Sequence, residues 1–143
     1  MMQLIFYLAT LLAAPLWVGM ILLPGHAVTR RIMATPWSLA PVAGLYTLLL
    51  LLHLPAAIAS LATLSFNAIG AFLASPFGTT LNWLHLATSD LVVGRWIYLE
   101  TRERPLDSRV VSIILVVCWV FAPLGLILYL AARVYLLLNV PSP

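Results

Sequence analysis

The sequence predicts an all-α integral membrane protein: a four-helix bundle with short loops, in one transmembrane domain over residues 1–143. Two observations indicate this class. Of the residues, 64% are hydrophobic and only 8% are charged, and long apolar runs alternate with short breaks that contain proline, glycine or arginine. A soluble domain has about 45–50% apolar and about 25% charged residues. The composition therefore excludes a water-soluble enzyme, a disordered tail and a coiled coil.

The first two runs have recognisable ends. A transmembrane helix needs about 20 mostly apolar residues. The first run covers residues 3–23 and stops at Pro24-Gly25. No basic residue precedes it and it is too long for the apolar part of a signal peptide, so we expect it to be retained. The second run covers residues 37–64, and Thr35-Pro36 supplies an N-cap and a first-turn proline.

The third and fourth runs differ in length. The third covers residues 79–99 and follows the breaker Ser75-Pro76-Phe77-Gly78. The fourth covers residues 109–138 and contains Pro123 and Gly125. It is longer than the hydrocarbon layer requires, so we expect it to kink, tilt or protrude. It also contains the single cysteine, Cys118, which excludes internal disulfides and cysteine zinc sites and is expected to be a small core residue.

Arginines are concentrated in two of the three connections between the runs. The first connection carries two and the third carries three, whereas residues 65–78 have no charge. These five arginines are Arg30, Arg31, Arg102, Arg104 and Arg109. Because short cytoplasmic loops are enriched in basic residues, we expect both connections in the cytoplasm and both termini outside. The uncharged connection is apolar enough to lie in the interface or to dip back into the membrane.

Polar residues inside the apolar runs are concentrated in the third one. At 100° per residue, a continuous stripe forms along one helical face. The stripe consists of Asn82, His85, Ser89, Trp96 and Glu100. Asp90 lies about 100° from Ser89, and Arg95 lies about 140° from Asp90. Asp90 therefore needs a partner from another helix, or it is protonated. Hydrogen bonding between helices would explain His85 structurally, and snorkelling to the interface would explain Arg95.

The distance of each residue from the cytoplasmic end of its run relates the two histidines inside the apolar runs. His53 lies about 24 Å from the cytoplasmic edge and His85 about 21 Å from it, so we expect the two rings to face one interhelical space. By the same arithmetic, Tyr46 and Asp90 lie one or two turns closer to the cytoplasm. The matched depth of His53 and His85 fits the two axial ligands of a b-type haem, but this hypothesis gives Asp90 no role. Alternatively, His53 bonds a carbonyl freed by Pro55.

The segment from Trp83 to Trp96 resembles the signature of the neoxanthin-synthase-like family, which is named for a plant abscisic-acid-deficiency locus. The signature is a Trp and a His, then Asp-Leu, then Gly-Arg-Trp, and here it reads Trp83-Leu84-His85, Asp90-Leu91 and Gly94-Arg95-Trp96. The flanks are also similar, at residues 17–24, at Thr29 and at residues 123–125. The resemblance implies a four-span membrane protein over nearly the whole chain.

The resemblance also implies carotenoid chemistry. Plant members are required to convert violaxanthin into neoxanthin, an isomerisation that opens an epoxide and creates an allene. An acid protonates the epoxide oxygen and a base removes a vinylic proton. Carried over, Asp90 is the acid, His85 the base or its orienter, and Arg95 a positioning charge. The expected substrate-binding residues are Asn82, Trp83, Ser89, Trp96, His53 and Tyr46, and no metal site is expected.

Three functions remain open at this point. The first is a cofactor-free isomerase acting on a carotenoid, a xanthophyll or another lipophilic molecule. The second is an assembly subunit that binds a pigment or other membrane subunits without chemistry, and the third is the haem protein. The first residues enter the first apolar run directly, without a plastid transit peptide, so we expect the inner membrane of a bacterium. The scattered arginines and the absence of lysine do not suit nucleic acid.

Overall fold

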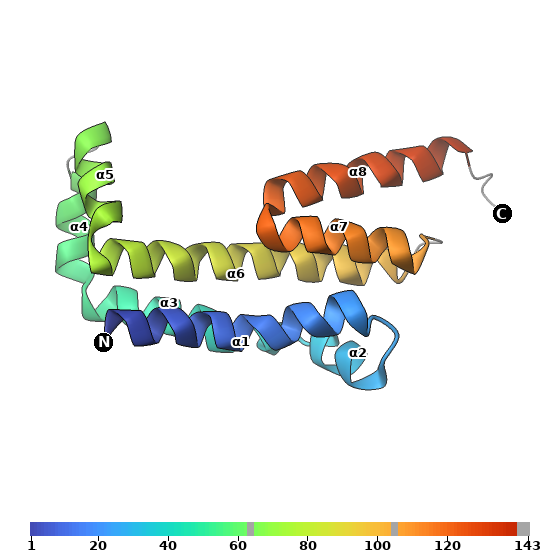
Figure 1. The fold of residues 1–143 in the computed structure, drawn as a ribbon, viewed down its shortest axis with the longest axis horizontal. Helices are drawn as coiled ribbons and strands as arrows, with labels where there is room; N and C mark the ends of the chain where they lie inside the picture. Colours follow the sequence, from blue (N-terminus) through green and yellow to red (C-terminus); the bar gives the residue numbers. More distant parts are fainter. Residues whose placement is uncertain (63–64, 104–105, 140–143) are drawn as a thin grey trace. The chain divides into compact units, whose positions relative to one another are not determined.

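The computed structural model describes residues 1–62, 65–103 and 106–139, and the secondary structure of this part of the chain consists of helices, without a β-strand (Figure 1). The predicted all-α class is confirmed. In chain order the elements are α1 (Met2–Leu22), α2 (Ala27–Ala34), the 3₁₀-helix η1 (Pro36–Leu39), α3 (Ala40–Leu52), α4 (Leu54–Ala62), α5 (Phe66–Ala74), α6 (Pro76–Thr101), α7 (Ser108–Val120) and α8 (Ala122–Asn139). Arg104, one of the arginines used for the topology, lies outside the described residues.

The chain divides into two compact units. Unit 1 comprises Met1–Ala14 and Leu39–Thr88, and unit 2 comprises Pro15–Ser38 and Ser89–Pro143. Helices α1 and α6 each contribute one part to either unit.

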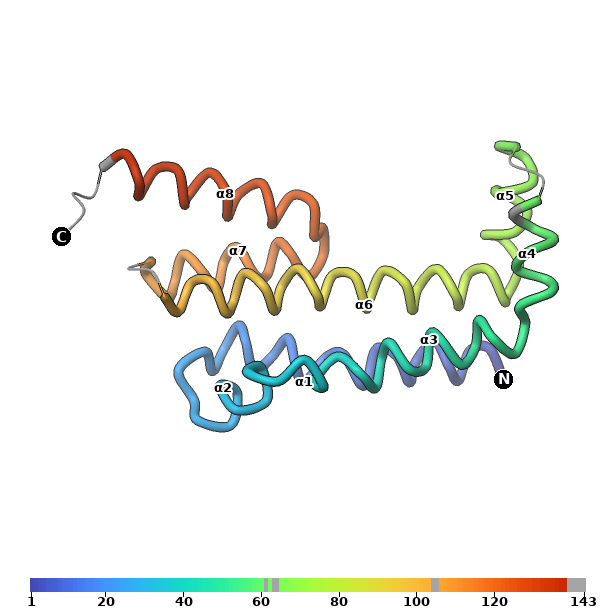
Figure 2. Tube along the Cα trace, turned by 180° about the vertical axis from the view of Figure 1, so that it is seen from behind, coloured from blue at the N-terminus to red at the C-terminus, as the bar shows by residue number. Residues whose placement is uncertain are grey.

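In unit 1 the second apolar run is broken at His53, where a single helix over residues 37–64 was expected. Helix α3 ends at Leu52, and α4 turns away from it (Figure 2). Pro55 explains the break, because a proline at this position lacks an N–H and its ring clashes with the carbonyl four residues earlier. The His53 N–H bonds Leu50 O, which leaves Leu49 O to accept a hydrogen bond from His53 Nδ1 at 3.2 Å. The alternative explanation of His53, a hydrogen bond to a backbone carbonyl at the break near Pro55, agrees with this contact.

The uncharged connection over residues 65–78 is itself helical. Ser65 caps α5 by accepting a hydrogen bond from Ala68 N. Ser75 donates to Phe72 O at 2.6 Å and accepts from Gly78 N at 3.0 Å, which closes the turn into α6. A Cβ atom on Gly78 would meet Phe72 O, so the turn requires glycine. The expected third run is thus present, and it extends three residues earlier and two residues later than predicted.

In unit 2 a tryptophan packs against a glycine at the centre of the core. Trp17 is almost fully buried, and its ring lies against the face of α6 at Gly94. A Cβ atom at Gly94 would lie 2.4 Å from Trp17 Cη2. The other large side chains of unit 2 that are fully buried come from α1, α2, α6, α7 and α8. They are Met20, Met33, Leu91, Ile97, Tyr98, Leu115, Cys118 and Tyr129.

The fourth apolar run forms a helical hairpin, so the expectation of one long helix over residues 109–138 is wrong. The helix stops at Phe121, two residues before Pro123, and α8 runs back along α7 (Figures 1 and 2). Gly125 permits the close return, because a Cβ atom there would lie 2.5 Å from Cys118 Cα. Cys118 is fully buried, as expected of a core residue.

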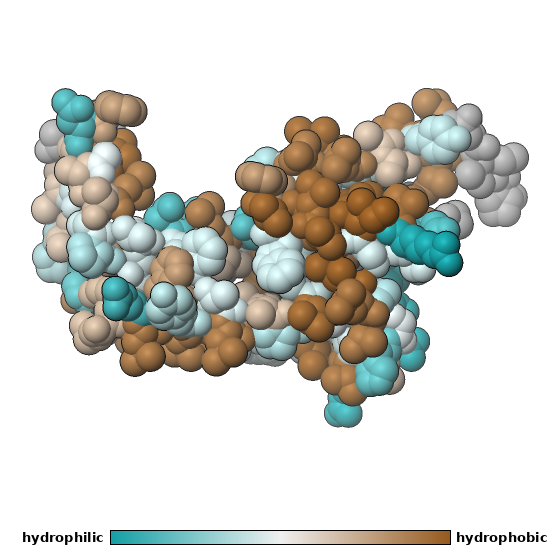
Figure 3. All heavy atoms as spheres, viewed as in Figure 1, coloured by the Kyte–Doolittle hydropathy of each residue, from teal (hydrophilic) through white to brown (hydrophobic). Residues whose placement is uncertain are grey.

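Few of the described helices fit a membrane span by length and composition. Met2–Leu22 does, and Ala27–Ala34 with Pro36–Leu52 does if this broken pair is counted as one span. Helix α7, at 13 residues, is about 20 Å long, which is short for a hydrocarbon layer of about 30 Å. Four spanning helices are therefore not found in the described residues. The outer faces of α7 and α8 are nevertheless strongly apolar (Figure 3).

The contact between Trp17 and Gly94 yields a stability prediction. We expect Gly94→Ala to lower the free energy of unfolding by about 1–3 kcal/mol, because the added methyl must displace a buried ring. Thermal unfolding of the purified protein in detergent, followed by circular dichroism, measures the change.

Gly44 supplies the matched control, because a Cβ atom there meets nothing within 4 Å. Gly44→Ala should leave the transition unchanged or raise it slightly. Adding Trp17→Leu to Gly94→Ala should recover part of the loss. Equal transitions for Gly94→Ala and Gly44→Ala would contradict the packing described here.

Candidate functional site

The residues predicted to form the site lie on α6 or on α3 and its C-terminal end, and they fall into the two units. Tyr46, His53, Asn82, Trp83 and His85 belong to unit 1. Ser89, Asp90, Arg95 and Trp96 belong to unit 2.

In unit 1, His85 packs beside Tyr46. The ring centroids are 5.9 Å apart and the ring planes are inclined at 49°. The structure thus brings together two predicted site residues from α3 and α6, although the depth arithmetic placed Tyr46 at a different level. His85 and its neighbour Asn82 are exposed on the surface of the unit. Their polar groups are accessible to a ligand or to a partner.

His53 does not share this position. Its ring stacks on Phe77, with centroids 4.8 Å apart, and its Nδ1 bonds a backbone carbonyl. Phe77 precedes His85 by eight residues on α6, which corresponds to about 12 Å along the helix. The expectation of one shared interhelical space for the two histidines is therefore corrected. It assumed that the second helix begins at Trp37, whereas Trp37 lies in η1 and α3 begins at Ala40.

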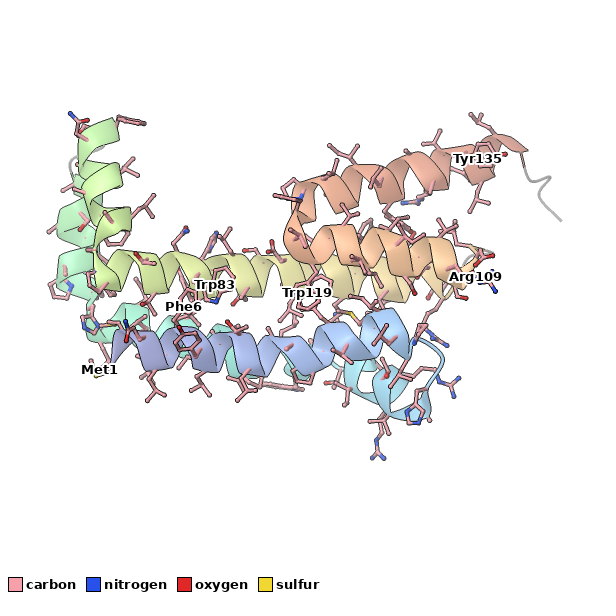
Figure 4. The ribbon with its side chains drawn as sticks, viewed as in Figure 1. Met1, Phe6, Trp83, Arg109, Trp119 and Tyr135 are labelled. Atoms are coloured by element: carbon pink, nitrogen blue, oxygen red, sulfur yellow. The ribbon has the colours of Figure 1, made fainter. Side chains whose placement is uncertain are left out.

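Trp83 is held by two residues of α1 that sequence reasoning did not identify. Its ring stacks on Phe6, with centroids 4.8 Å apart and an interplanar angle of 23° (Figure 4). Its Nε1 donates to Thr10 Oγ1 at 3.0 Å, and the Thr10 hydroxyl in turn donates to Phe6 O. The spacing of four residues places Phe6 and Thr10 on one face of α1. That spacing was visible in the sequence, but nothing in it indicated Trp83 as the partner.

In unit 2, Asp90 is half-buried in an aromatic and apolar neighbourhood. It lies one helical turn before Gly94, against which Trp17 packs, and Trp17 stacks on Trp119 with centroids 6.2 Å apart. The Asp90 carboxylate acts electrostatically on the thiol of Cys118 in α7. The prediction that Asp90 interacts with another helix is consistent with this neighbour. Ser89, the preceding residue, is also half-buried.

Arg95, which the sequence suggested as a positioning charge or a snorkelling side chain, bonds the backbone of α2. Its Nε donates to Met33 O at 2.9 Å and its Nη2 to Ala34 O at 3.5 Å. These are carbonyls of the last turn of α2, which has no further helical N–H groups to satisfy them. A cation at this end of a helix is also favoured by the helix dipole. Arg95 therefore holds α2 against α6 within unit 2.

The last two turns of α6 are tied to α8. Trp96, which is 39% exposed, meets Tyr129 edge-on with ring centroids 5.3 Å apart. One turn later, Glu100 pairs with Arg133 at 3.6 Å. The sequence placed Arg133 near an outer C-terminal end, far from Glu100. The hairpin of α7 and α8 brings them together.

Groups of three or more residues able to hold a metal ion are not found among the residues that the structure describes. The haem hypothesis requires His53 and His85 to face a single iron. His53 packs on Phe77 of α6, whereas His85 lies about two helical turns further along α6, so the described contacts do not bring the two rings together.

Comparison with known proteins identifies the family. The model of one family, described as ABA DEFICIENT 4-like, matches residues 4–129, a range that includes the whole segment from Trp83 to Trp96. Neither the curated proteins nor the solved structures provide a match. The family match agrees with the resemblance seen in the signature of α6. The chain therefore belongs to the ABA DEFICIENT 4-like family.

Proposed function

We propose that this protein is a bacterial inner-membrane protein that binds a carotenoid or a related lipophilic molecule and isomerises it without a cofactor. Family membership over residues 4–129 supports the class of substrate. The half-buried carboxyl group of Asp90 supports the chemistry, because it is the one acidic side chain within the family's signature segment.

The apolar surface supports the membrane part of this proposal. Large apolar side chains remain strongly exposed on several helices of either unit, as a bilayer would require. Examples are Leu4 and Leu11 on α1, Leu52 on α3, and Leu137 and Leu138 on α8. Helix α1 is also long and apolar enough to cross a bilayer.

The chemistry needs one acid and one base. In the family's plant reaction, a proton delivered to the epoxide oxygen allows the C–O bond to break, and loss of a vinylic proton supplies the electron pair that forms the allene. No atom is gained or lost, so no redox cofactor is required. We assign the acid to Asp90, which belongs to unit 2. Arg95 is omitted from this assignment because its Nε and Nη2 donate to backbone carbonyls of α2.

Binding without catalysis is the second candidate. The exposed polar side chains of Asn82 and His85 favour it, because polar groups within an apolar helix usually face a partner rather than lipid. In that case, the protein would hold a pigment or join other membrane subunits, and Asp90 would serve only to stabilise unit 2.

Topology provides the first test. We expect Ser65→Cys to react with an impermeant maleimide on intact spheroplasts and Ser108→Cys to remain unlabelled, both in a Cys118→Ala background. The reason is that arginines lie in the first connection and around the start of α7, which favours the cytoplasmic side for both, whereas residues 65–78 carry no charge. The opposite labelling pattern would reverse the orientation.

The same spheroplasts test the C-terminus. Because α8 returns along α7, we expect a periplasm-active phosphatase fused after Pro143 to be inactive. An active fusion would mean that residues 109–138 cross the membrane as one helix, as the sequence alone suggested.

Substitution of Asp90 tests the proposed chemistry. In a strain that accumulates violaxanthin, we expect Asp90→Asn to reach normal protein levels and to lower pigment conversion at least about 100-fold, the usual contribution of a general acid. His85→Gln should reduce conversion less. Pigment profiles and immunoblots of the same membranes provide both measurements.

Asp107→Asn is the matched control. Asp107 caps α7 by accepting a hydrogen bond from Arg109 N, a role that asparagine fills equally well, so conversion should not change. Full conversion by a normally inserted Asp90→Asn variant would refute catalysis by Asp90. If that variant fails to accumulate, Asp90 has the structural role instead.

A further inference from the structure

A cavity of about 390 Å³ lies in unit 1 between the first turns of α1 and the turn from α5 into α6. Its volume is within the range typical of small-molecule sites. The described lining contains none of the residues that the family's signature pointed to. The side chains that decide what it can hold are Gln3, Phe6, Tyr7, Ala74, Thr79 and Thr80.

One wall of the cavity is aromatic and fixed in place. Tyr7 meets Phe6 edge-on, with centroids 5.6 Å apart, and Phe6 stacks on Trp83 behind it. The hydrogen bond from Trp83 Nε1 to Thr10 prevents the stack from rotating. The rings of Phe6 and Tyr7, whose planes are inclined at 87°, form an apolar corner against which an apolar ring can pack.

The opposite wall accepts hydrogen bonds. Thr79 Oγ1 donates to Leu73 O and Thr80 Oγ1 donates to Pro76 O, each at 2.7 Å. A hydroxyl has one hydrogen, so both oxygens have only lone pairs left for a ligand. The amide of Gln3, at the rim, both donates and accepts.

Charge restricts the ligand further. The described lining of the cavity contains no aspartate, glutamate, lysine, arginine or histidine. A charged ligand would therefore find no charged side chain there to pair with. A neutral ligand with an apolar body and a hydroxyl that donates a hydrogen bond satisfies both walls.

We propose that this cavity binds the hydroxylated end ring of a polyene, with the ring on Phe6 and Tyr7 and its hydroxyl donating to Thr79 or Thr80. The proposal rests on the proposed function for the class of ligand, and it adds the position of one end of that ligand. It also gives Trp83 a role, because this residue supports the aromatic wall from behind.

The test compares zeaxanthin with β-carotene, which lacks the ring hydroxyls. Purified protein in detergent is titrated with each, and quenching of tryptophan fluorescence reports binding. We expect Thr79→Val to weaken zeaxanthin binding about three- to tenfold, as the loss of one hydrogen bond implies, and to leave β-carotene binding unchanged. Ala74→Trp, which fills the cavity from an exposed position, should weaken binding of both.

Two substitutions in the same unit serve as matched controls. Thr47 is an exposed threonine whose hydroxyl donates to Ala43 O, as Thr79 does to Leu73 O, and Ala71 is exposed on α5 outside the cavity. Thr47→Val and Ala71→Trp should bind both carotenoids like the unmodified protein.

The outcomes separate the two proposals. If the unmodified protein binds zeaxanthin and the cavity variants bind it equally well, the cavity proposal is wrong while the proposed function stands. Equal weakening by Thr79→Val and Thr47→Val also refutes it. If the unmodified protein binds neither carotenoid, the proposed function fails, and the cavity assignment fails with it.

Discussion

Backbone groups at helix breaks need partners, and this chain has few polar side chains with which to provide them. In apolar surroundings an unsatisfied carbonyl costs several kcal/mol. In several places a side chain donates a hydrogen bond to such a carbonyl. His53 donates to Leu49 O, and Arg95 donates to Met33 O and Ala34 O. Tyr98 and Arg102 both donate to Pro24 O, and Ser112 donates to Ile21 O. Several residues that look functional in the sequence are therefore used to end helices.

This use of polar residues narrows the candidate site. His53 and Arg95 bond backbone carbonyls, so these contacts need no role in chemistry to explain them. Within the signature segment of α6, His85, Ser89 and Asp90 remain candidates for the proposed site. Asp90 differs from the other two because it is an acid, and it lies one helical turn before Gly94, against which the buried ring of Trp17 packs. An acidic group in such surroundings is a common feature of sites for acid–base chemistry.

The sequence allowed prediction of what depends on local pattern. The all-helical class followed from composition, the first and third helices from apolar runs between Pro-Gly breaks, and the family from the spacing of His85, Asp90 and Gly94. The features that could not be predicted from the sequence depend on which helices pack against each other. The return of α8 along α7 requires Gly125 to pack against Cys118, and the depth of the histidines depends on the register of α3 against α6. A proline indicates that a helix will be interrupted, but the angle of the interruption is set by tertiary contacts.

The position of the single cysteine makes the hairpin accessible to measurement. Cys118 is fully buried, and Gly125 of α8 passes close to its backbone, so a thiol reagent reaches the sulfur only when the packing around it opens. When reclosing is faster than alkylation, the rate of modification is proportional to the fraction of molecules in which this packing is open. The chain therefore contains its own probe of local opening, without an added label, and the same rate recorded with and without a bound pigment would show whether ligand binding and hairpin closure are coupled.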